Sequence, residues 1–365
     1  SVKGIAAEVA VKIEKRLSNG SYLNLSKEAR IISGLHGKSG FPNLFVYGKE
    51  DSYDYMATTL LGLNLDKYMR ICGGRFNLKT TLMLADQILT RIETFHNAGY
   101  IHRDIKPENF VMGLGSQNKT VYLIDFGLAR GYLDSQGKHI SAREKKGLVG
   151  TARYASINSH LGRELSRRDD LESIGYMFVY LMKGKLPWQN VKAATLEEKY
   201  KIIADLKAST LCEVLCKDLP KEFASYLNHV KNLSFQETPN YKALRRLFRM
   251  LFVESGYDYD YNYGWMKEHQ NSGSKGTKPS SRVLVSDPNK AAQRDSGVRG
   301  RERGFTFAKP NKITESYNQI ENVVEEEKGE ESTHGEKEEN KRLNGAHIGT
   351  KPKQENFEMH TASTS

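Results

Sequence analysis

The chain of 365 residues carries a formal net charge of +11 and contains only 3 cysteines. So few cysteines exclude a disulfide-rich scaffold and are typical of proteins from a reducing compartment. No apolar stretch approaches the roughly 18 residues of a membrane-spanning helix, and we expect neither a membrane span nor a signal peptide. Because the sequence starts with Ser1, we expect it to be a fragment or a processed form.

The N-terminal part is predicted to combine short strands with helices. Residues 8–13 alternate in hydrophobicity and predict a strand, and residues 25–32 are good helix formers with one apolar side. Two further strands are predicted at residues 41–45 and 53–62. Residues 78–96 carry apolar side chains at three- and four-residue spacing, which predicts a long helix with one face in the core.

Two motifs follow this predicted helix. The first reads Ile101-His-Arg-Asp-Ile-Lys-Pro-Glu-Asn-Phe110, and the second reads Tyr122-Leu-Ile-Asp-Phe-Gly127. An Asp-Phe-Gly triplet alone is often only a turn after a strand. His-Arg-Asp with Lys two residues and Asn five residues after its Asp is far more specific. Together the motifs resemble the catalytic loop and the metal-binding loop of protein kinases.

The resemblance implies phosphoryl transfer, which needs mainly positioning and charge stabilisation from the protein. Asp104 would accept the proton of the attacking hydroxyl group. Lys106 would place a positive charge near the transferred phosphoryl group. Asn109 and Asp125 would bind Mg²⁺ against the phosphates of ATP.

The same resemblance assigns roles to the N-terminal strands. Lys12 would contact the phosphates of ATP, although a solvent-facing lysine on an edge strand is the other interpretation. Its expected partner is Glu28 on the predicted helix, with Glu14 as the alternative. Thr58 would lie at the back of the adenine pocket, and the backbone from Thr59 to Leu61 would pair with adenine. A buried strand and turn without such contacts is the alternative there.

The implied fold class is α+β, a two-lobed protein kinase-like fold. A small antiparallel sheet lobe would cover about residues 1–61, and a larger helical lobe would cover about residues 62–270. Kinases normally cover the phosphates with a Gly-rich hairpin before the strand lysine. Only 11 residues precede Lys12, and no G-x-G-x-x-G pattern occurs. We therefore expect this hairpin to be missing from the chain and ATP to bind less tightly.

A narrower resemblance appears further along the chain. Gly150-Thr-Ala-Arg-Tyr-Ala-Ser-Ile-Asn158 has Ser-Ile-Asn where most kinases have Ala-Pro-Glu, and Ser166-Arg-Arg-Asp-Asp-Leu-Glu-Ser173 follows it. These segments resemble the casein kinase I family of serine/threonine protein kinases. The likeness covers about residues 1–268 and includes the segments at 186–189, 192–195 and 259–265.

The casein kinase I resemblance implies a substrate Ser or Thr with phosphoserine or an acidic stretch three residues before it. Arg103, Arg153 and Lys199 would form the site for this anion, since arginine binds phosphate oxygens in pairs. An exposed helix lysine is an equal interpretation of Lys199. Asn190 replaces a glycine that is usual beside this site and could narrow it. Residues 195–200 lack the basic stretch that is linked to nuclear entry in the family.

The rest of the globular part is predicted to be helical. Residues 170–182 predict a buried helix, and Asp170 at its start is expected to hold the backbone of the catalytic loop. Trp188 is predicted to be a packing anchor, and residues 195–253 alternate helical stripes with short loops. The polar residues 131–146 predict a surface loop that meets the substrate.

The composition changes at about residue 271, and we predict a disordered charged tail over residues 271–365. Residues 271–314 contain 10 basic and 3 acidic residues, whereas residues 315–339 contain 2 basic and 10 acidic residues. A solvating tail without a specific partner is the simplest interpretation. The alternative is autophosphorylation of the tail, with candidate sites at Ser274, Thr277, Ser280 and Thr333.

The sequence therefore predicts a serine/threonine kinase that uses ATP and Mg²⁺ on acidic or phosphorylated proteins. We expect a monomer in the cytoplasm, with the nucleus as the alternative location. The alternative function is a kinase-fold binding or scaffold protein without turnover. The basic charge also suits nucleic acid, but the chain has no recognition motif or stacking array, so no specific nucleic-acid binding is expected.

Overall fold

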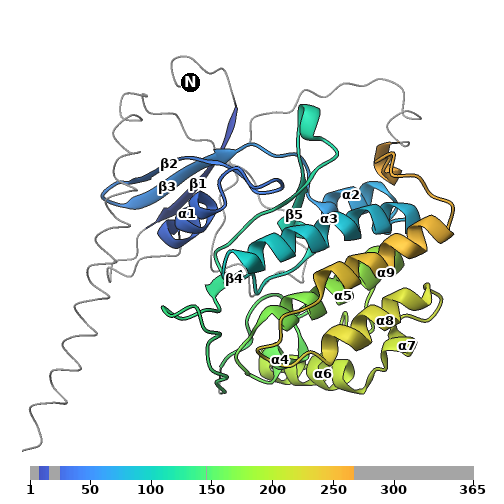
Figure 1. Cartoon of the computed structure of the whole chain (residues 1–365). Helices are drawn as coiled ribbons and strands as arrows, with labels where there is room; N and C mark the ends of the chain where they lie inside the picture. Colours follow the sequence, from blue (N-terminus) through green and yellow to red (C-terminus); the bar gives the residue numbers. More distant parts are fainter. Residues whose placement is uncertain (1–7, 16–24, 145, 267–365) are drawn as a thin grey trace, which may run out of the picture. The chain divides into compact units, whose positions relative to one another are not determined.

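The computed structural model describes residues 8–15, 25–144 and 146–266 (Figure 1). The predicted tail and its candidate sites Ser274, Thr277, Ser280 and Thr333 lie outside the described residues. A small antiparallel sheet with one helix precedes a mostly helical part, so the predicted two-lobed α+β fold class is confirmed. No helix in the described part of the chain is both long enough and apolar enough to cross a membrane.

Three antiparallel strands form the small sheet, in the order β1-β3-β2. They are β1 (Val9–Lys15), β2 (Leu44–Lys49) and β3 (Tyr53–Thr59). Successive side chains of a strand point to opposite faces, and along β1 the odd-numbered residues are exposed while the even-numbered ones are half-buried. Helix α1 (Leu25–Gly34) contacts β2 and β3. Lys12 therefore shares the half-buried face of β1.

The second strand begins later than the sequence predicted. It was expected at residues 41–45 but spans Leu44–Lys49. Pro42 has no amide hydrogen to donate to a ladder, and the pairing with β3 starts through Asn43. The amide of Asn43 donates to Oγ1 of Thr59 at 2.9 Å, and its carbonyl accepts from the amide of Thr59 at 3.0 Å.

Two helices follow the sheet, and asparagine side chains cap both. Asn64 accepts a hydrogen bond from the amide of Lys67 at the start of α2 (Leu65–Ile71), and Asn77 accepts one from the amide of Thr80 at the start of α3 (Leu78–Asn97). Such caps satisfy amide groups that have no partner within the helix. They fix where α3 begins, and α3 leads directly to the catalytic-loop motif.

Helix α3 forms the centre of the helical lobe. Its predicted apolar stripe is buried, with Leu82, Ala85, Ile88, Ile92 and Phe95 all at most 1% exposed. The helix packs against α5 (Arg167–Lys183) and α9 (Tyr241–Glu254), and α5 packs against α8 (Lys221–Lys231). The predicted buried helix at 170–182 is thus confirmed and begins three residues earlier, where Ser166 and Asp169 form a capping box.

Short elements connect these helices. Between α3 and α5 lie β4 (Tyr100–Ile101), η1 (Pro107–Asn109), β5 (Phe110–Met112), η2 (Gly115–Gln117), β6 (Val121–Leu123), β7 (Arg130–Gly131) and α4 (Ile157–His160). Between α5 and α8 lie α6 (Leu196–Ser209) and α7 (Cys212–Leu215). Trp188, which precedes α6, is 2% exposed, as expected of a packing anchor.

Candidate active site

The catalytic-loop motif lies between β4 and β5, and the hairpin of β5 and β6 joins it to the second motif. In this hairpin Phe110 pairs with Leu123. Asn109 directly precedes β5, and Asp125 comes two residues after β6. The amide of Ile124 also donates to the carbonyl of Asn109 at 3.0 Å. The strand register therefore brings the two motifs to the same end of the hairpin.

Both carboxylate oxygens of Asp104 are held by hydrogen bonds. Oδ1 accepts from the amide and from Oγ1 of Thr151, at 3.0 and 2.8 Å. Oδ2 accepts from Nζ of Lys106 at 2.5 Å and from Nδ2 of Asn109 at 3.4 Å. The residue is only 7% exposed. Asp104 is thus fixed before any substrate arrives, which reduces the cost of aligning it with a reacting hydroxyl.

Lys106 remains a cation in this setting. Burial acts to lower the pKa of its ammonium group, but the nearby carboxylates of Asp104 and Asp125 outweigh burial and raise the pKa above its ordinary value. The protein therefore keeps a positive charge next to the carboxylate that the sequence assigned as the proton acceptor.

Asp170 supports the catalytic loop from below. Its Oδ2 accepts from the amide of His102 at 2.7 Å, and its Oδ1 accepts from the amide of Arg103 at 2.8 Å. Nε2 of His96 lies 2.9 Å from the same Oδ2, and Nδ1 of His96 lies 2.7 Å from the hydroxyl of Tyr241. The expectation that Asp170 holds the backbone of this loop is confirmed.

The electrostatics of Asp170 and His96 agree with this arrangement. Burial alone would raise the pKa of Asp170, but hydrogen bonds and the neighbouring histidines lower it, so the group is a carboxylate. Burial lowers the pKa of His96. A neutral imidazole then donates from Nε2 to Asp170 and accepts at Nδ1 from Tyr241.

Lys12 contacts two carboxylates, one on each side of the junction between the sheet and the helical part. Its Nζ is 2.6 Å from Oε2 of Glu28 and 3.4 Å from Oδ1 of Asp125. Glu28 was the favoured partner from sequence, and the alternative, Glu14, instead accepts from the amide of Leu25 at 2.9 Å. The side chains of Lys12 and Asp125 remain 33% and 46% exposed, so both are accessible to a ligand.

The charges of Lys12, Glu28 and Asp125 depend on one another. Burial would lower the pKa of Lys12, but Glu28 and Asp125 raise it overall. Burial would raise the pKa of Asp125, yet Lys12, followed by His102 and Lys106, lowers it overall. For Glu28, burial dominates and raises the pKa despite its contact with Lys12. The accessible pair of Lys12 and Asp125 is thus fully ionised at neutral pH.

Two site residues have backbone conformations that side chains rarely adopt. Arg103 has φ of 65° and Asp125 has φ of 64°. Positive φ in residues other than glycine costs energy and is frequent at functional sites. The positive φ turns the backbone directly before Asp104 in the first motif and at Asp125 itself in the second.

The segment predicted to bind adenine joins the sheet to the helical part. Thr58 and Thr59 end β3, and the amide of Thr59 already donates to Asn43. In the described part of the chain the amide of Leu61 has no hydrogen-bond partner. Gly62 donates from its amide to the carbonyl of Met112 at 2.8 Å, and a Cβ at position 62 would lie 3.1 Å from that oxygen. In this described segment the amides of Leu60 and Leu61 are therefore left for a ligand.

The residues assigned to Mg²⁺ have suitable chemistry. Nδ2 of Asn109 donates to the carbonyl of Asp104 at 2.8 Å, which leaves its Oδ1 for a cation. Asp125 contributes an ionised, half-exposed carboxylate. Mg²⁺ is usually bound by one or two protein oxygens together with substrate phosphates and water. Among the described residues there is no cluster of three or more His, Cys, Asp or Glu side chains that could hold a metal without a substrate.

The three residues assigned to the substrate anion lie in different surroundings. Nε of Arg103 donates to the carbonyl of Leu128 at 2.7 Å. The guanidinium group of Arg153 lies over the ring of Tyr180, 5.5 Å from its centroid. Lys199 lies in the first turn of α6 and is partly exposed. No contact in the described residues joins the side chains of Arg103 and Arg153.

Other cations accompany Arg103, and the sequence interpretation missed them. Burial lowers the pKa of Arg103, and the positive charge of Arg130 lowers it further. Burial and the charges of Arg103 and Arg130 likewise lower the pKa of Lys27. Glu164 pairs with Arg130 at 3.2 Å and with Lys146 at 3.7 Å. We call Lys27, Arg103, Arg130 and Lys146 the loop cation cluster.

The positions of these residues give sequence signals that could have identified the cluster. Arg130 comes three residues after the Asp-Phe-Gly triplet, and Lys27 adjoins Glu28. Thr151 was also missed, although it directly follows Gly150 in a segment that was singled out. Gly150 has φ of +85°, and a Cβ there would lie 2.4 Å from the carbonyl oxygen of Arg103. This close approach places Thr151 against Asp104.

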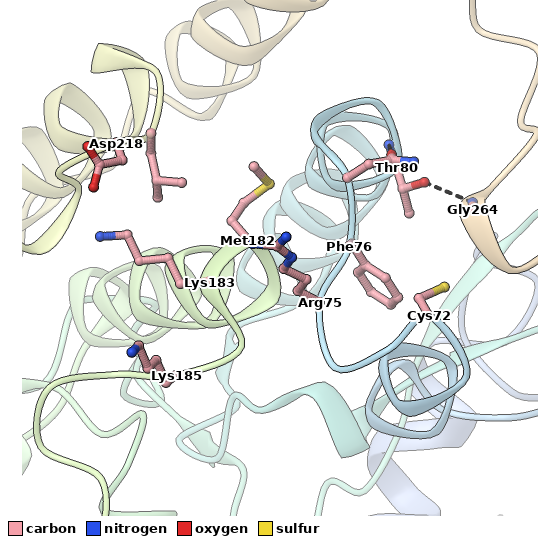
Figure 2. Close-up of a pocket in the computed structure, with 11 residues that line it drawn as sticks. Cys72, Arg75, Phe76, Thr80, Met182, Lys183, Lys185, Asp218 and Gly264 are labelled. Atoms are coloured by element: carbon pink, nitrogen blue, oxygen red, sulfur yellow. Dashed lines mark hydrogen bonds between the residues drawn. The ribbon is translucent and has the colours of Figure 1, made fainter.

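A cavity of about 700 Å³ lies elsewhere in the helical part (Figure 2). It is bordered by the start of α3, the end of α5 and the segment between α7 and α8, and its charged lining consists of Arg75, Lys183, Lys185 and Asp218. None of the predicted site residues lines it. We therefore place the candidate active site at the junction between the sheet and the helical part.

A sheet lobe joined to a helical lobe, with an ionised lysine, two aspartates and an asparagine at their junction, defines the protein kinase class. The family model for the protein kinase domain matches residues 3–242 of the chain. The chain belongs to this family. Its members use ATP and a divalent metal ion on protein substrates.

Proposed function

We propose that the chain is a serine/threonine protein kinase of the casein kinase I type. It transfers the γ-phosphoryl group of ATP to Ser or Thr in acidic or already phosphorylated proteins, and Mg²⁺ is the accompanying metal ion. The kinase domain covers residues 1–270, with the small lobe ending at about residue 61. The sequence segments 150–158 and 166–173 support the narrower family, and the geometry of Asp104 carries the catalytic assignment.

The position of Asp104 suits it to receive a proton. Its carboxylate is fixed by Thr151 on one oxygen and by Lys106 on the other. In the reaction, the substrate hydroxyl oxygen forms a bond to the γ-phosphorus, and the bond from that phosphorus to the bridging oxygen of ADP breaks. The hydroxyl proton passes to the carboxylate of Asp104. Lys106 balances negative charge on the transferred group, which favours the transition state in a partly buried site.

Lys12 and Asp125 organise the nucleotide side of the site. Lys12 is held by Glu28, which is 3% exposed, and it presents its ammonium group toward Asp125. That ammonium group would bind phosphate oxygens of ATP. Asn109 and Asp125 would hold Mg²⁺, which supplies charge neutralisation to the phosphates when bound. The free amide of Leu61 would bind the adenine edge.

The loop cation cluster supports the proposed preference for anionic substrates. Glu164 pairs with two of its four cations, Arg130 and Lys146. Burial first, and then the neighbouring positive charges, lower the pKa values of Arg103 and Lys27. A cluster whose positive charges are not balanced attracts anions. Arg103 belongs to this cluster and also follows His102 in the catalytic loop, so a bound anion would lie close to the reacting groups.

The proposal is tested with a serine peptide that carries phosphoserine three residues before the acceptor, compared with the same peptide carrying serine there. The enzyme is expected to transfer phosphate to both and to have the lower KM for the phosphorylated peptide. Asp125→Asn should abolish the transfer. Equal activity of this variant would show that the activity comes from a contaminant, and equal kinetics for both peptides would contradict the substrate preference.

A further inference from the structure

Lys207, on α6, is one of the most deeply buried cations in the described part of the chain. It is 1% exposed although it is a lysine. Its Nζ lies 5.0 Å from the ring centroid of Tyr176 and 5.2 Å from that of Trp188. Lysine is seldom fully buried unless its charge is satisfied by partners. Lys207 has no role in the proposed phosphoryl transfer.

The hydrogen-bond partners of Lys207 lie in one short stretch and in the helix α4 that follows it. Nζ donates to the carbonyl oxygen of Ala152 at 2.8 Å and to that of Ala155 at 2.5 Å. Nε2 of His160 lies 3.2 Å away. The ammonium group therefore holds two backbone carbonyls that lie on either side of Arg153. We call residues 151–155 the clamped segment.

The clamped segment connects two functional groups. At its start, Thr151 donates from its amide and its hydroxyl to Asp104. At its centre, the carbonyl of Arg153 accepts from Nε1 of Trp188 at 2.7 Å, while the guanidinium group extends over Tyr180. A shift of this segment would displace both the hydrogen-bond partner of Asp104 and the arginine assigned to the substrate anion.

Carboxylates of α5 hold the residues that follow. Oε1 of Glu172 accepts from the amide of Ile157 at 2.9 Å, and Oδ1 of Asp169 accepts from the hydroxyl of Ser156 at 2.8 Å. Carboxyl groups of α5 thus hold donors at residues 156 and 157, whereas Lys207 holds acceptors at residues 152 and 155. In the described part of the chain no other side chain donates to the carbonyl of Ala155.

We infer that Lys207 is a positioning residue for substrate binding, which fixes the clamped segment so that Arg153 meets the substrate anion and Thr151 holds Asp104. The inference rests on the proposed function, because it concerns the same substrate site. It adds Lys207 of α6 to the substrate site, although Lys207 itself would contact neither the nucleotide nor the reacting atoms. Loss of the ammonium group would leave the carbonyl of Ala155 buried without a donor.

The protonation of Lys207 gives a second way to observe its role. Burial lowers the pKa of Lys207 to about 7, although Glu172 on α5 acts to raise it. The other titratable groups facing it are Tyr176 on α5, whose pKa is raised by burial, and His160 on α4, whose pKa is lowered to about 4 by burial and by Lys207. Both stay neutral near pH 7. Burial also raises the pKa of Glu172, which faces Lys207 from α5. Loss of the proton from Lys207 weakens its hold on the two carbonyls.

The test compares Lys207→Met and Lys207→Gln with Lys201→Met, which removes an exposed lysine from the same helix. For each protein, kcat and KM are measured with the peptide carrying phosphoserine at minus three and with the unphosphorylated peptide. For Lys207→Met we expect KM for the phosphorylated peptide to rise at least tenfold, with KM for ATP unchanged. Lys207→Gln keeps two N–H donors in a shorter side chain and should give an intermediate rise, and Lys201→Met should match the native protein.

The pH dependence provides the readout that a merely structural role would not change. The ratio of the KM of Lys207→Met to that of the native protein should be largest at pH 6 and fall as pH rises above about 7, because only the native protein has an ammonium group to lose. A native KM for the phosphorylated peptide in either Lys207 variant would overturn the inference. So would a ratio that does not vary with pH. Failure of the native protein to prefer the phosphorylated peptide would instead contradict the proposed substrate class.

Discussion

Asp170 and Arg103 are 67 residues apart in the chain, yet Oδ1 of Asp170 accepts a hydrogen bond of 2.8 Å from the amide of Arg103. The second carboxylate oxygen binds the amide of His102 at 2.7 Å. Arg103 has φ of 65°, a conformation that costs energy. The helical lobe thus stabilises a strained turn of the catalytic loop with one buried carboxylate.

Asp170→Asn should damage both stability and catalysis. An asparagine has one oxygen and one NH₂ group, so it can accept from only one of the two amides, and the other amide would face a donor. The free energy of unfolding should fall by about 2 kcal/mol, the order expected for a buried group left unsatisfied. In urea denaturation, Asp205→Asn at an exposed position of α6 serves as the control. Native stability of Asp170→Asn would contradict this role.

The His96 site predicts how stability depends on pH. Burial lowers the pKa of His96, so protonation favours the unfolded chain. The contribution of neutral His96 to the free energy of unfolding is complete above about pH 6.5, the pKa of an unperturbed histidine. It is lost as pH falls toward the lower pKa that His96 has in the folded state. Between these values the free energy of unfolding should decrease by up to about 1.4 kcal/mol per pH unit from this residue.

Denaturation of His96→Gln at several pH values checks this dependence. The variant should be less stable at pH 8 and should show a shallower loss of stability below pH 6.5. Part of the slope should remain, because the pKa of His160 is also lowered, to about 4. An unchanged slope in His96→Gln would mean that His96 does not titrate in this way.

Gly150→Ala should disturb the contact between Thr151 and Asp104. The glycine has φ of +85°, and an added Cβ would lie 2.4 Å from the carbonyl oxygen of Arg103. Gly137→Ala is a matched control, because Gly137 has φ of +74° with nothing within 4 Å of the added Cβ. Both variants carry the backbone strain, of about 1 kcal/mol, but only Gly150→Ala should also reduce kcat, about tenfold or more. Equal kcat in the two variants would rule out the close approach as a catalytic requirement.

Thr151→Val removes one hydroxyl and keeps the shape of the side chain. Asp104 then loses the 2.8 Å hydrogen bond from Oγ1 but keeps the bond from the amide. Hydrogen bonds to charged groups contribute about 1.5–3 kcal/mol, so kcat should fall on the order of tenfold with little change in KM for ATP. Thr120→Val, which removes a hydroxyl bonded to Gln117, should leave steady-state kinetics unchanged.

Lys12→Met should mainly affect the nucleotide. Without the ammonium group, Asp125 loses the largest influence that keeps its pKa low, and Glu28 is left buried without its partner. We expect kcat/KM for ATP to fall on the order of 100-fold, an effect of the size seen for a missing electrostatic contact in an active site. Lys15→Met on the same strand is the control. A native kcat/KM for Lys12→Met would remove this lysine from the site.

The sequence was most informative where chemistry and local pattern coincide. The resemblance of the two motifs to protein kinases was enough to predict that Asp104 and Asn109 lie near Asp125. In the structure the pairing of β5 with β6 brings the two motifs together. The same resemblance predicted that Lys12 pairs with a glutamate on the next helix, and Glu28 was the favoured candidate there. The long apolar stripe of α3 showed which face of this helix is buried.

Contacts between distant segments could not be predicted in this way. Nothing local to Lys207 distinguishes it from the exposed lysines of α6, and its burial depends on how α6 packs against α4. Tyr241 and His96 are 145 residues apart, and only the packing of α3 against α9 brings them together. The start of β2 was missed for a simpler reason, since hydrophobicity in residues 41–45 does not reveal that pairing is delayed until after Pro42.

The hydrogen bond from Tyr241 to His96 has a consequence for synthesis on the ribosome. Asp170, which binds the catalytic loop, is hydrogen-bonded to His96. His96 in turn is hydrogen-bonded to the hydroxyl of Tyr241 on α9. A nascent chain that has not yet exposed residue 241 contains the side chains that we propose for catalysis but lacks this final connection. Competence for phosphoryl transfer should therefore arise late, only after α9 has emerged and docked.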